Sequence, residues 1–339
     1  MRRRSAGILA FAIGTFLGCT SGVTRAETYS SYEQYYEAVN ELEGRQAYTE
    51  ALKLVQDVWG QFPERRFDLS KELLYLYRKT EQYEKCLSVW EKGHRQGFFY
   101  MILPTMKQYE PFTGFEKFAA IADEDKRLRE AALEKSQTIF EIVLPQNYDE
   151  KREYPLLIVL HGGGSNIERA KKHWHSPLLG SEYIVAFIRS YLHYDSETFG
   201  WKVFDPRARE DIRKCFDDIV TQYPVDTARV VIGGISAGGT AAIDFTFNQV
   251  IPLAGFIGVC PGKPQEFDSL RASQAAAAGL KGVIIGGETD MYRPRQEAMV
   301  EILKQTGFPY RFDIIEGMGH DYPGDLPQRL DEALAYLIG

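Results

Sequence analysis

One serine, which lies between glycines, has sequence neighbours typical of a catalytic nucleophile. Ser236 lies in Gly234-Ile235-Ser236-Ala237-Gly238, after an apolar run that starts at Val230 and before a helical run. A strand that turns sharply into a helix at such a motif exposes the hydroxyl above the sheet, with a helix N-terminus behind it. A serine hydroxyl is a weak nucleophile until an aligned base takes its proton. The motif therefore predicts a nucleophile that needs an acid–base partner elsewhere.

The surroundings of Ser236 resemble the α/β-hydrolase family, and the resemblance covers about residues 137–339. The shared feature is the Gly-x-Ser-x-Gly motif in its strand–turn–helix context. The resemblance implies a mainly parallel sheet with helices on both faces. It also implies nucleophilic catalysis that uses no metal and no organic cofactor.

In this family the nucleophile is followed by an acid and then by a histidine, and the chain supplies both in that order. Asp290 follows the apolar run 283–285, and His320 ends a glycine-containing loop after the last predicted strand. Ser236, Asp290 and His320 thus resemble a catalytic triad with His320 as general base and then acid. Glu288 is a nearby alternative acid that lies closer to the strand.

A glycine-rich loop after the apolar run 154–160 resembles the oxyanion-hole loop of the same family. It reads His161-Gly162-Gly163-Gly164, and its glycines let backbone N–H groups point at a developing oxyanion. Gly163 or Gly164 would supply one donor, and the N–H of Ala237 would supply the other. The histidine of the loop is given no chemical role.

Aromatic and basic side chains near the strand ends are candidates for substrate contact. The segment 191–205 joins a strand end to a helix, and Tyr194 and Trp201 within it are candidate substrate-binding residues. Packing beneath the loop is the alternative interpretation for each ring. Arg293 and Arg295 follow the candidate acid and could meet an acidic substrate, although exposed helix charges are the ordinary interpretation.

No combination of cysteine and histidine predicts a metal site. His173-Trp174-His175 has no carboxylate or third histidine at ligand spacing, so we expect a solvated loop there. Cys86, Cys215 and Cys260 lie far apart, and the sequence holds no CxxC pair. A Cys215–Cys260 disulfide would need an oxidising compartment, and we favour buried thiols.

The elements that must position these residues alternate between two kinds. Apolar strand-like runs and amphipathic helical runs follow one another from residue 137 onward, which predicts a mainly parallel sheet covered on both faces. The predicted strands are 138–144, 154–160, 183–188, 230–235, 253–259, 283–285 and 312–315. The predicted helices are 208–222, 237–248, 268–278, 296–305 and 326–337. Ligands bind at the carboxyl ends of such strands, where the candidate residues fall.

Residues 27–135 have a helical period instead, so the predicted fold is an α/β domain at 136–339 preceded by an all-α domain. Segments 47–52 and 82–87 superimpose when shifted by 35 residues, with tyrosine and leucine at matching places. This spacing resembles tetratricopeptide-type helical hairpins. About two such hairpins cannot bury both faces, so we expect them to dock on the rest of the chain or on a partner.

The first 26 residues have the pattern of a secretory signal. Three arginines at 2–4 precede an uncharged apolar run at 6–17, and small residues follow. Cleavage after Ala26 is one alternative. The other is a bacterial lipoprotein signal, because Leu17-Gly18-Cys19 resembles a lipoprotein box with Cys19 as the lipidated residue. Either predicts export to the periplasm, the outer membrane or the medium, with membrane attachment only through the lipid.

Composition limits the class of function. The 339 residues are 44% hydrophobic and 26% charged, as in ordinary globular proteins, and the net charge of −7 argues against nucleic acid as a partner. The signal pattern and the α/β-hydrolase resemblance together imply an exported serine hydrolase that acts on a small carboxylic ester through an acyl-enzyme on Ser236. The alternatives are a prolyl-oligopeptidase-like serine peptidase acting on short peptides, acyl transfer to an alcohol, and a non-catalytic binding protein that uses the helical hairpins.

Overall fold

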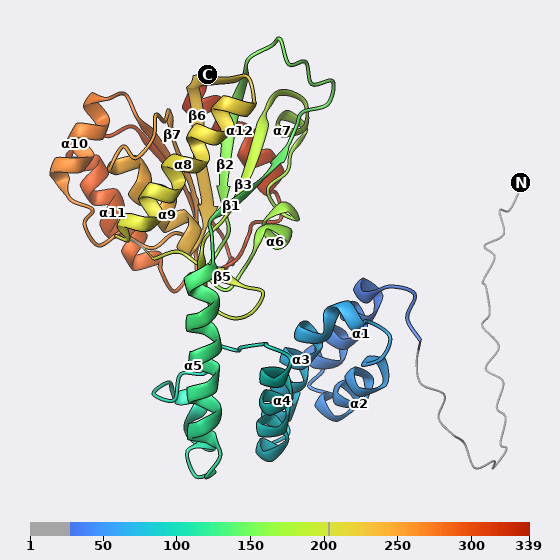
Figure 1. Cartoon of the computed structure of the whole chain (residues 1–339). Coiled ribbons are helices and arrows are strands. Elements are labelled where there is room, and N and C mark those ends of the chain that lie inside the picture. The colour runs from blue at the N-terminus through green and yellow to red at the C-terminus, as the bar shows by residue number, and fades with distance from the viewer. Residues whose placement is uncertain (1–27, 203) are drawn as a thin grey trace, which may run out of the picture. The chain divides into compact units, whose positions relative to one another are not determined.

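The computed structural model describes residues 28–202 and 204–339 (Figure 1). They form two compact units, which divide between Glu81 and Gln82. The predicted signal at 1–26, including Cys19, lies outside the described residues. Within the described ranges, no helix combines the length and the apolar character needed to cross a membrane.

The first unit is helical, as its sequence period predicts. Its first helix, α1 (Tyr32–Gly44), begins after Ser31, whose hydroxyl accepts the N–H of Gln34 and so caps the helix. The following elements are α2 (Tyr48–Val58), the 3₁₀ turn η1 (Pro63–Arg65) and α3 (Arg66–Lys79). The apolar faces of the three helices are buried, at Tyr35, Val39, Val55, Val58, Leu69 and Leu76 among others.

The second unit begins with further helices, which are α4 (Tyr83–Arg95), the 3₁₀ segment η2 (Lys107–Phe112) and α5 (Phe118–Lys135). Aromatic rings join them, and the Trp90 and Phe112 ring centroids lie 4.8 Å apart. The buried carboxylate of Asp125 on α5 accepts the N–H groups of Tyr100 and Ile102, at 2.6 and 2.8 Å. This carboxylate therefore fixes the linker that follows α4.

The boundary between compact units differs from the predicted domain boundary. The sequence period changes near residue 135, but the units divide after Glu81, so α4 and α5 belong to the same unit as the sheet. The period shows where helices give way to strands and does not show which helices pack on the strands. The tetratricopeptide resemblance of the helical region stays a prediction.

A seven-stranded sheet forms the centre of the second unit, as far as the described residues show. Its strands are β1 (Ile139–Val143), β2 (Tyr154–Leu160), β3 (Ile184–Arg189), β6 (Val225–Ile235), β7 (Gly255–Val259), β8 (Lys281–Gly287) and β9 (Tyr310–Ile315). The order across the sheet is β1-β3-β2-β6-β7-β8-β9. Only the edge strand β1 runs antiparallel to its neighbour.

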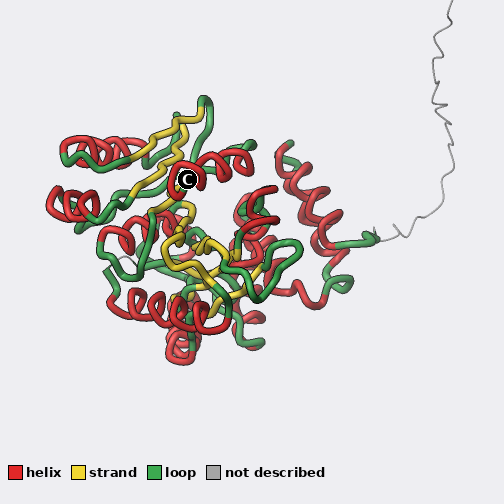
Figure 2. The backbone as a smooth tube through the Cα atoms, turned by 90° about the horizontal axis from the view of Figure 1, so that it is seen from above, coloured by secondary structure: helices red, strands yellow, loops and turns green. Residues whose placement is uncertain are grey.

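Helices cover both faces of this sheet (Figures 1 and 2). One face packs on α8 (Pro206–Gln222), α9 (Ala237–Phe247), α10 (Ser269–Ala277) and α11 (Arg293–Gln305). The other packs on α6 (Ile167–Lys171), α7 (Pro177–Glu182) and α12 (Leu326–Ile338). Every residue of β2 is buried, which explains why its sequence is continuously apolar.

The predicted strands and long helices of this unit correspond to observed elements, with ends that differ by a few residues. Short elements escaped prediction. They are α6, α7 and the hairpin of β4 (Leu192–His193) and β5 (Phe199–Gly200). Elements of two to six residues are too short to show a hydrophobic period.

Candidate active site

Ser236 lies at the junction of β6 and α9, in the strand–turn–helix arrangement that its motif predicts. Its φ and ψ are 54° and −116°, a strained conformation for a residue that carries a Cβ atom. The Ser236 N–H donates to the carbonyl of Val259, at the end of the adjacent β7, at 2.9 Å. The sharp turn places the residue at the carboxyl edge of the sheet.

Two glycines make this turn sterically feasible. A Cβ atom on Gly234 would lie 2.6 Å from the carbonyl oxygen of Leu160 on β2. A Cβ atom on Gly238 would overlap the carbonyl oxygens of Leu160 and His161. The motif therefore needs glycine at both places, because α9 and the end of β2 approach each other at backbone distance.

His320 contacts both other members of the predicted triad. Its Nε2 lies 2.8 Å from Ser236 Oγ, and its Nδ1 lies 2.8 Å from Asp290 Oδ1. An ionised carboxylate can only accept, so the proton of the neutral ring belongs on Nδ1 and Nε2 is left to accept from the serine hydroxyl. The structure thus brings the three residues together from loops after β6, β8 and β9.

Asp290 is buried, and its carboxylate is fully engaged by donors. Besides His320, the N–H of Tyr292 donates to Oδ1 at 3.0 Å and Nε2 of Gln296 donates to Oδ2 at 2.7 Å. Burial alone would raise the pKa of Asp290, but the hydrogen bonds from Tyr292, His320 and Gln296 outweigh it and lower the pKa. The carboxylate therefore stays charged beside the imidazole.

Glu288, the alternative acid, does not contact His320. Its side chain is exposed, and its Oε2 accepts the N–H of Gly317 at 2.8 Å. Glu288 therefore braces the loop that carries the histidine.

The oxyanion-hole prediction narrows to one of its two glycines. The N–H of Gly164 already donates to the carbonyl of Phe199 at 2.9 Å, which favours Gly163 of the two predicted alternatives. A Cβ atom on Gly163 would lie 3.4 Å from Cβ of Ala237, so this glycine lies beside the start of α9. Within the described residues, the N–H groups of Gly163 and Ala237 have no hydrogen-bond acceptor.

His161 holds the glycine loop 161–164 in place through hydrogen bonds of its ring. Its Nδ1–H donates to the carbonyl of Gly162 at 2.8 Å, and its Nε2 accepts the N–H of Ser190 at 3.3 Å. Burial lowers the pKa of His161 to about 4, so the ring is neutral at pH 7. This structural role agrees with its omission from the predicted chemistry.

Trp201, a predicted substrate-binding residue, points into the core. Its side chain is buried in the core, and its indole N–H donates to the carbonyl of His161 at 2.9 Å. Of the two interpretations offered for this ring, the structure favours packing beneath the loop. The sequence placed Trp201 in the correct segment but could not show that the ring points inward.

Tyr194 does border the candidate site. A Cβ atom on Gly163 would lie 3.5 Å from its ring, and burial of Tyr194 raises the pKa of its hydroxyl. Tyr292, which the sequence analysis did not single out, meets the His320 ring edge-on at a centroid distance of 5.1 Å. Two tyrosines therefore stand near the triad.

The hairpin that carries Tyr194 is tied to the helical segment of the same unit. Its turn residue Ser196 donates its N–H to the carbonyl of Phe99 at 3.1 Å. In return, Ser196 Oγ accepts the N–H of Phe99 at 2.8 Å. The linker after α4 thus supports the loop beside the candidate oxyanion hole.

The segment His173-Trp174-His175 lies in a loop with both histidines exposed, as predicted. Trp174 between them is buried, and the His173 ring stacks on Tyr322 at a centroid distance of 4.0 Å. Cys215 and Cys260 are buried thiols, and burial raises the pKa of each to about 12.

Cys260 also lies beside the triad, because its Sγ and ligand atoms of Asp290 and His320 lie within 4.8 Å of one another. Both ring nitrogens of His320 are already bonded to the other triad members. A metal at this place would have to displace one of them.

The strand order, the turn at Ser236 and the Ser–His–Asp contacts define the α/β-hydrolase fold. The sequence matches no protein-family model and no curated protein. Among solved structures, an uncharacterized protein from Bacillus cereus ATCC 10987 is similar with a TM-score of 0.51 and 22% identity, over 91% of this chain and 99% of that one.

Two further solved structures are similar to a smaller share of the chain. Esterase PE8 has a TM-score of 0.48 and 16% identity, over 59% of this chain and 98% of that one. Dipeptidyl peptidase 4 of Porphyromonas gingivalis has a TM-score of 0.45 and 20% identity, over 58% of this chain and 33% of that one.

Proposed function

We propose that the protein is a serine hydrolase that cleaves a carboxylic ester through an acyl-enzyme on Ser236. The observation that carries the proposal is the unbroken contact from Ser236 Oγ to His320 Nε2 and from His320 Nδ1 to Asp290, at 2.8 Å each. A serine hydroxyl in hydrogen-bond contact with an oriented imidazole is the arrangement that nucleophilic acyl transfer requires.

The geometry supports a two-step reaction. As Ser236 Oγ attacks the ester carbonyl, its proton passes to His320 Nε2, and Asp290 stabilises the imidazolium. The N–H groups of Gly163 and Ala237 hold the oxyanion of the tetrahedral intermediate. Its collapse expels the alcohol, which takes the proton from His320. Water then attacks the acyl-enzyme with the same imidazole as base, and the serine is regenerated.

The setting outside the cytoplasm is part of the proposal. The arginines, the apolar run and the small residues of 1–26 support export, and Cys19 supports a lipid anchor. Mass spectrometry of the mature N-terminus after expression in a bacterium would separate the alternatives. A chain that begins at Cys19 with a lipid, or one that begins at Glu27, agrees with export. An intact leader contradicts it.

The first test is covalent labelling with a fluorophosphonate probe, which reacts with activated serines. We expect the wild-type protein to be labelled and Ser236→Ala and His320→Ala to lose labelling. Ser181→Ala and His175→Ala are matched controls, because Ser181 lies on α7 and His175 is exposed. Equal labelling of wild type and Ser236→Ala would contradict the nucleophile.

The second test measures which acyl bond is cleaved. We expect the wild type to hydrolyse 4-nitrophenyl butyrate faster than aminoacyl 4-nitroanilides, and Ser236→Ala to lose about 10⁴-fold or more in kcat. Faster cleavage of the anilides would replace the esterase by the peptidase alternative. Release of a butyrate ester when an alcohol is added would show transfer instead of hydrolysis.

A further inference from the structure

A pocket of about 560 Å³ in the second unit is lined by Phe204, Thr240, Lys263, Pro264, Gln265 and Arg295. This volume is in the range that accommodates small ligands. The lining residues include two cations and no carboxylate.

The pocket contacts the triad directly through Thr240 and indirectly through Arg295. The hydroxyl of Thr240, one turn into α9, donates to the carbonyl of Ser236 at 2.9 Å. The Arg295 guanidinium lies 5.1 Å from the ring centroid of Tyr292, whose ring meets the imidazole of His320 edge-on. Thr240, Lys263 and Arg295 follow the carboxyl ends of β6, β7 and β8, which is the edge where ligands bind in such sheets.

The two cations of this pocket have no ionic partner. Among the described residues, neither Lys263 nor Arg295 forms an ion pair with a carboxylate within 4.0 Å. The neighbouring Arg293, in contrast, pairs with Glu297 at 2.8 Å. Glu266, next along the chain from Gln265, pairs with Arg209 and Arg271 instead.

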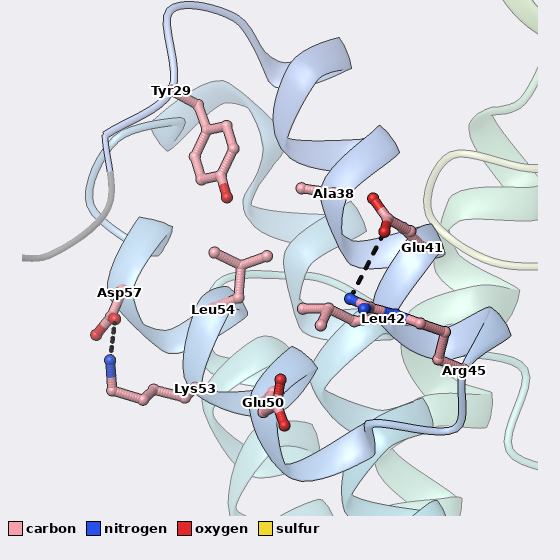
Figure 3. Close-up of a pocket in the computed structure, with 9 residues that line it drawn as sticks. All are labelled: Tyr29, Ala38, Glu41, Leu42, Arg45, Glu50, Lys53, Leu54 and Asp57. Carbon is pink, nitrogen blue, oxygen red and sulfur yellow. Dashed lines mark hydrogen bonds and ion pairs between the residues drawn. The ribbon is translucent and has the colours of Figure 1, made fainter. Parts of the chain in front are cut away.

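A pocket between α1 and α2 in the first unit shows the ordinary arrangement of charges (Figure 3). Its two cations are each paired within their own helix. Arg45 lies 3.6 Å from Glu41, and Lys53 lies 3.0 Å from Asp57. Paired charges of this kind leave no excess positive charge for a ligand.

The position of Arg295 adds a second argument. It stands in the first turn of α11, where the helix dipole is positive and a cation is disfavoured. An anion between Lys263 and Arg295 would compensate both charges and the dipole.

We propose that this pocket binds an anionic group of the substrate, so that the protein prefers esters with a carboxylate or phosphate a few atoms from the scissile carbonyl. This inference rests on the proposed function. The Arg295 guanidinium can bind an oxyanion through two hydrogen bonds, and the Lys263 ammonium adds a point charge. Phe204 and Pro264 supply an apolar wall for the short chain between the anion and the ester.

The test compares two esters of equal chain length, 4-nitrophenyl hydrogen glutarate and 4-nitrophenyl pentanoate. We expect wild type to favour the glutarate in kcat/KM, mainly through KM. The Lys263→Gln/Arg295→Gln protein should lose about 10-fold or more of this ratio, as the loss of hydrogen bonds to a charged group implies. Lys304→Gln, an exposed change in the last turn of α11, is the matched control and should keep the ratio.

A ratio that is equal in wild type and in the double variant would overturn the inference while leaving the hydrolase proposal intact. If wild type cleaves neither ester, the hydrolase proposal fails. A binding measurement then still tests whether the pocket takes an anionic group. Calorimetric titration of Ser236→Ala with glutaryl 4-nitroanilide should then show binding that Lys263→Gln/Arg295→Gln abolishes. If pentanoyl 4-nitroanilide binds as tightly as glutaryl 4-nitroanilide, the pocket has no preference for an anion and the inference is contradicted. Displacement by inorganic phosphate or by glutarate, compared at equal concentration, separates a phosphate site from a carboxylate site.

Discussion

At the scale of single residues, the carboxylate of Asp290 depends on a neighbour that takes no part in the chemistry. Gln296 is buried on α11, and its amide donates both to Asp290 and to the carbonyl of Pro261, at 2.7 and 3.2 Å. Its own Oε1 has no hydrogen-bond partner among the described residues. Gln296 is therefore a positioning residue, and its buried amide oxygen carries an uncompensated desolvation penalty.

Replacing Gln296 with leucine should make the stability of the protein less dependent on acid pH and its activity more sensitive to acid. Asp290 has a lowered pKa in the folded state, so its contribution to stability is present above the unfolded pKa and is lost as the pH falls through the folded pKa. Removing the Gln296 hydrogen bond raises that folded pKa. We therefore expect the difference in unfolding free energy between pH 7 and pH 3 to shrink in Gln296→Leu, and kcat to fall.

The difference between two pH values cancels any general loss of packing in the variant. Gln305→Leu, in the exposed last turn of the same helix, should leave the difference unchanged. An unchanged difference in Gln296→Leu would show that the amide does not influence the ionisation of Asp290.

The sequence could predict the triad because each member follows a strand end, in the order that the family resemblance implies. It could not choose between Gly163 and Gly164, because the choice depends on a hydrogen bond from Gly164 to Phe199, far along the chain. Gln296 carried no signal, since one glutamine on an amphipathic helix is ordinary. Lys263 was overlooked because a single lysine in a loop is also ordinary.

At the scale of elements, the catalytic turn is held by close approach between α9 and the end of β2. Gly238 marks that contact, because a Cβ atom there would overlap the carbonyl oxygens of Leu160 and His161. The backbone at Leu160 and His161 continues directly into the glycine loop that holds the predicted oxyanion donor. A disturbance at Gly238 therefore reaches Ser236 and the loop at once.

Gly238→Ala should destabilise the protein by about 1–3 kcal/mol, as overpacking of a tight contact does. It should also lower kcat, because the oxyanion loop must move away from the start of α9. Urea unfolding and ester hydrolysis measure the two effects. Gly180→Ala on α7, where a Cβ atom would meet nothing within 4 Å, is the control. Wild-type stability in Gly238→Ala would contradict the close approach.

Long elements were predictable from the sequence, and short ones were not. Continuous apolar runs identified β2 and β7, since both strands are fully buried. The β4–β5 hairpin has strands of two residues each, so no period could reveal it. That hairpin nevertheless carries Tyr194 to the site, where it stands beside Gly163.

At the scale of the whole molecule, the first unit contains a half-buried acidic pair. The Glu72 carboxyl on α3 shares a hydrogen bond with Glu43 on α1, and burial, this bond and the charges of Glu43 and Asp68 raise the pKa of Glu72 to about 8. The hydroxyl of Tyr35 is buried near this pair. The folded unit thus keeps a proton that an unfolded chain would release.

This pair predicts a stability that decreases with rising pH. Unfolded Glu72 releases its proton above about pH 4.5, whereas the folded unit retains it up to about pH 8. Stability should fall across this window and level off above it. Glu72→Gln, which resembles the protonated acid in shape, should abolish the fall and stabilise the unit at pH 8.

Hydrogen–deuterium exchange in α1 and α3, corrected for intrinsic exchange rates, would report the local stability at pH 5 and pH 8. Glu37→Gln, an exposed change on α1, should retain the wild-type dependence. Identical protection at both pH values in the wild type would contradict a shared proton between Glu43 and Glu72.

The Phe99–Ser196 hydrogen bonds have a consequence for the descent of this chain. They join the linker after α4 to the hairpin beside Gly163, and the compact unit that contains both begins at Gln82 and not at the first strand. A gene fusion that carried only residues 136–339 would leave the hairpin beside Gly163 without its support. Residues 82–135 therefore support the loop beside Gly163, although the proposed chemistry assigns them no reactive group.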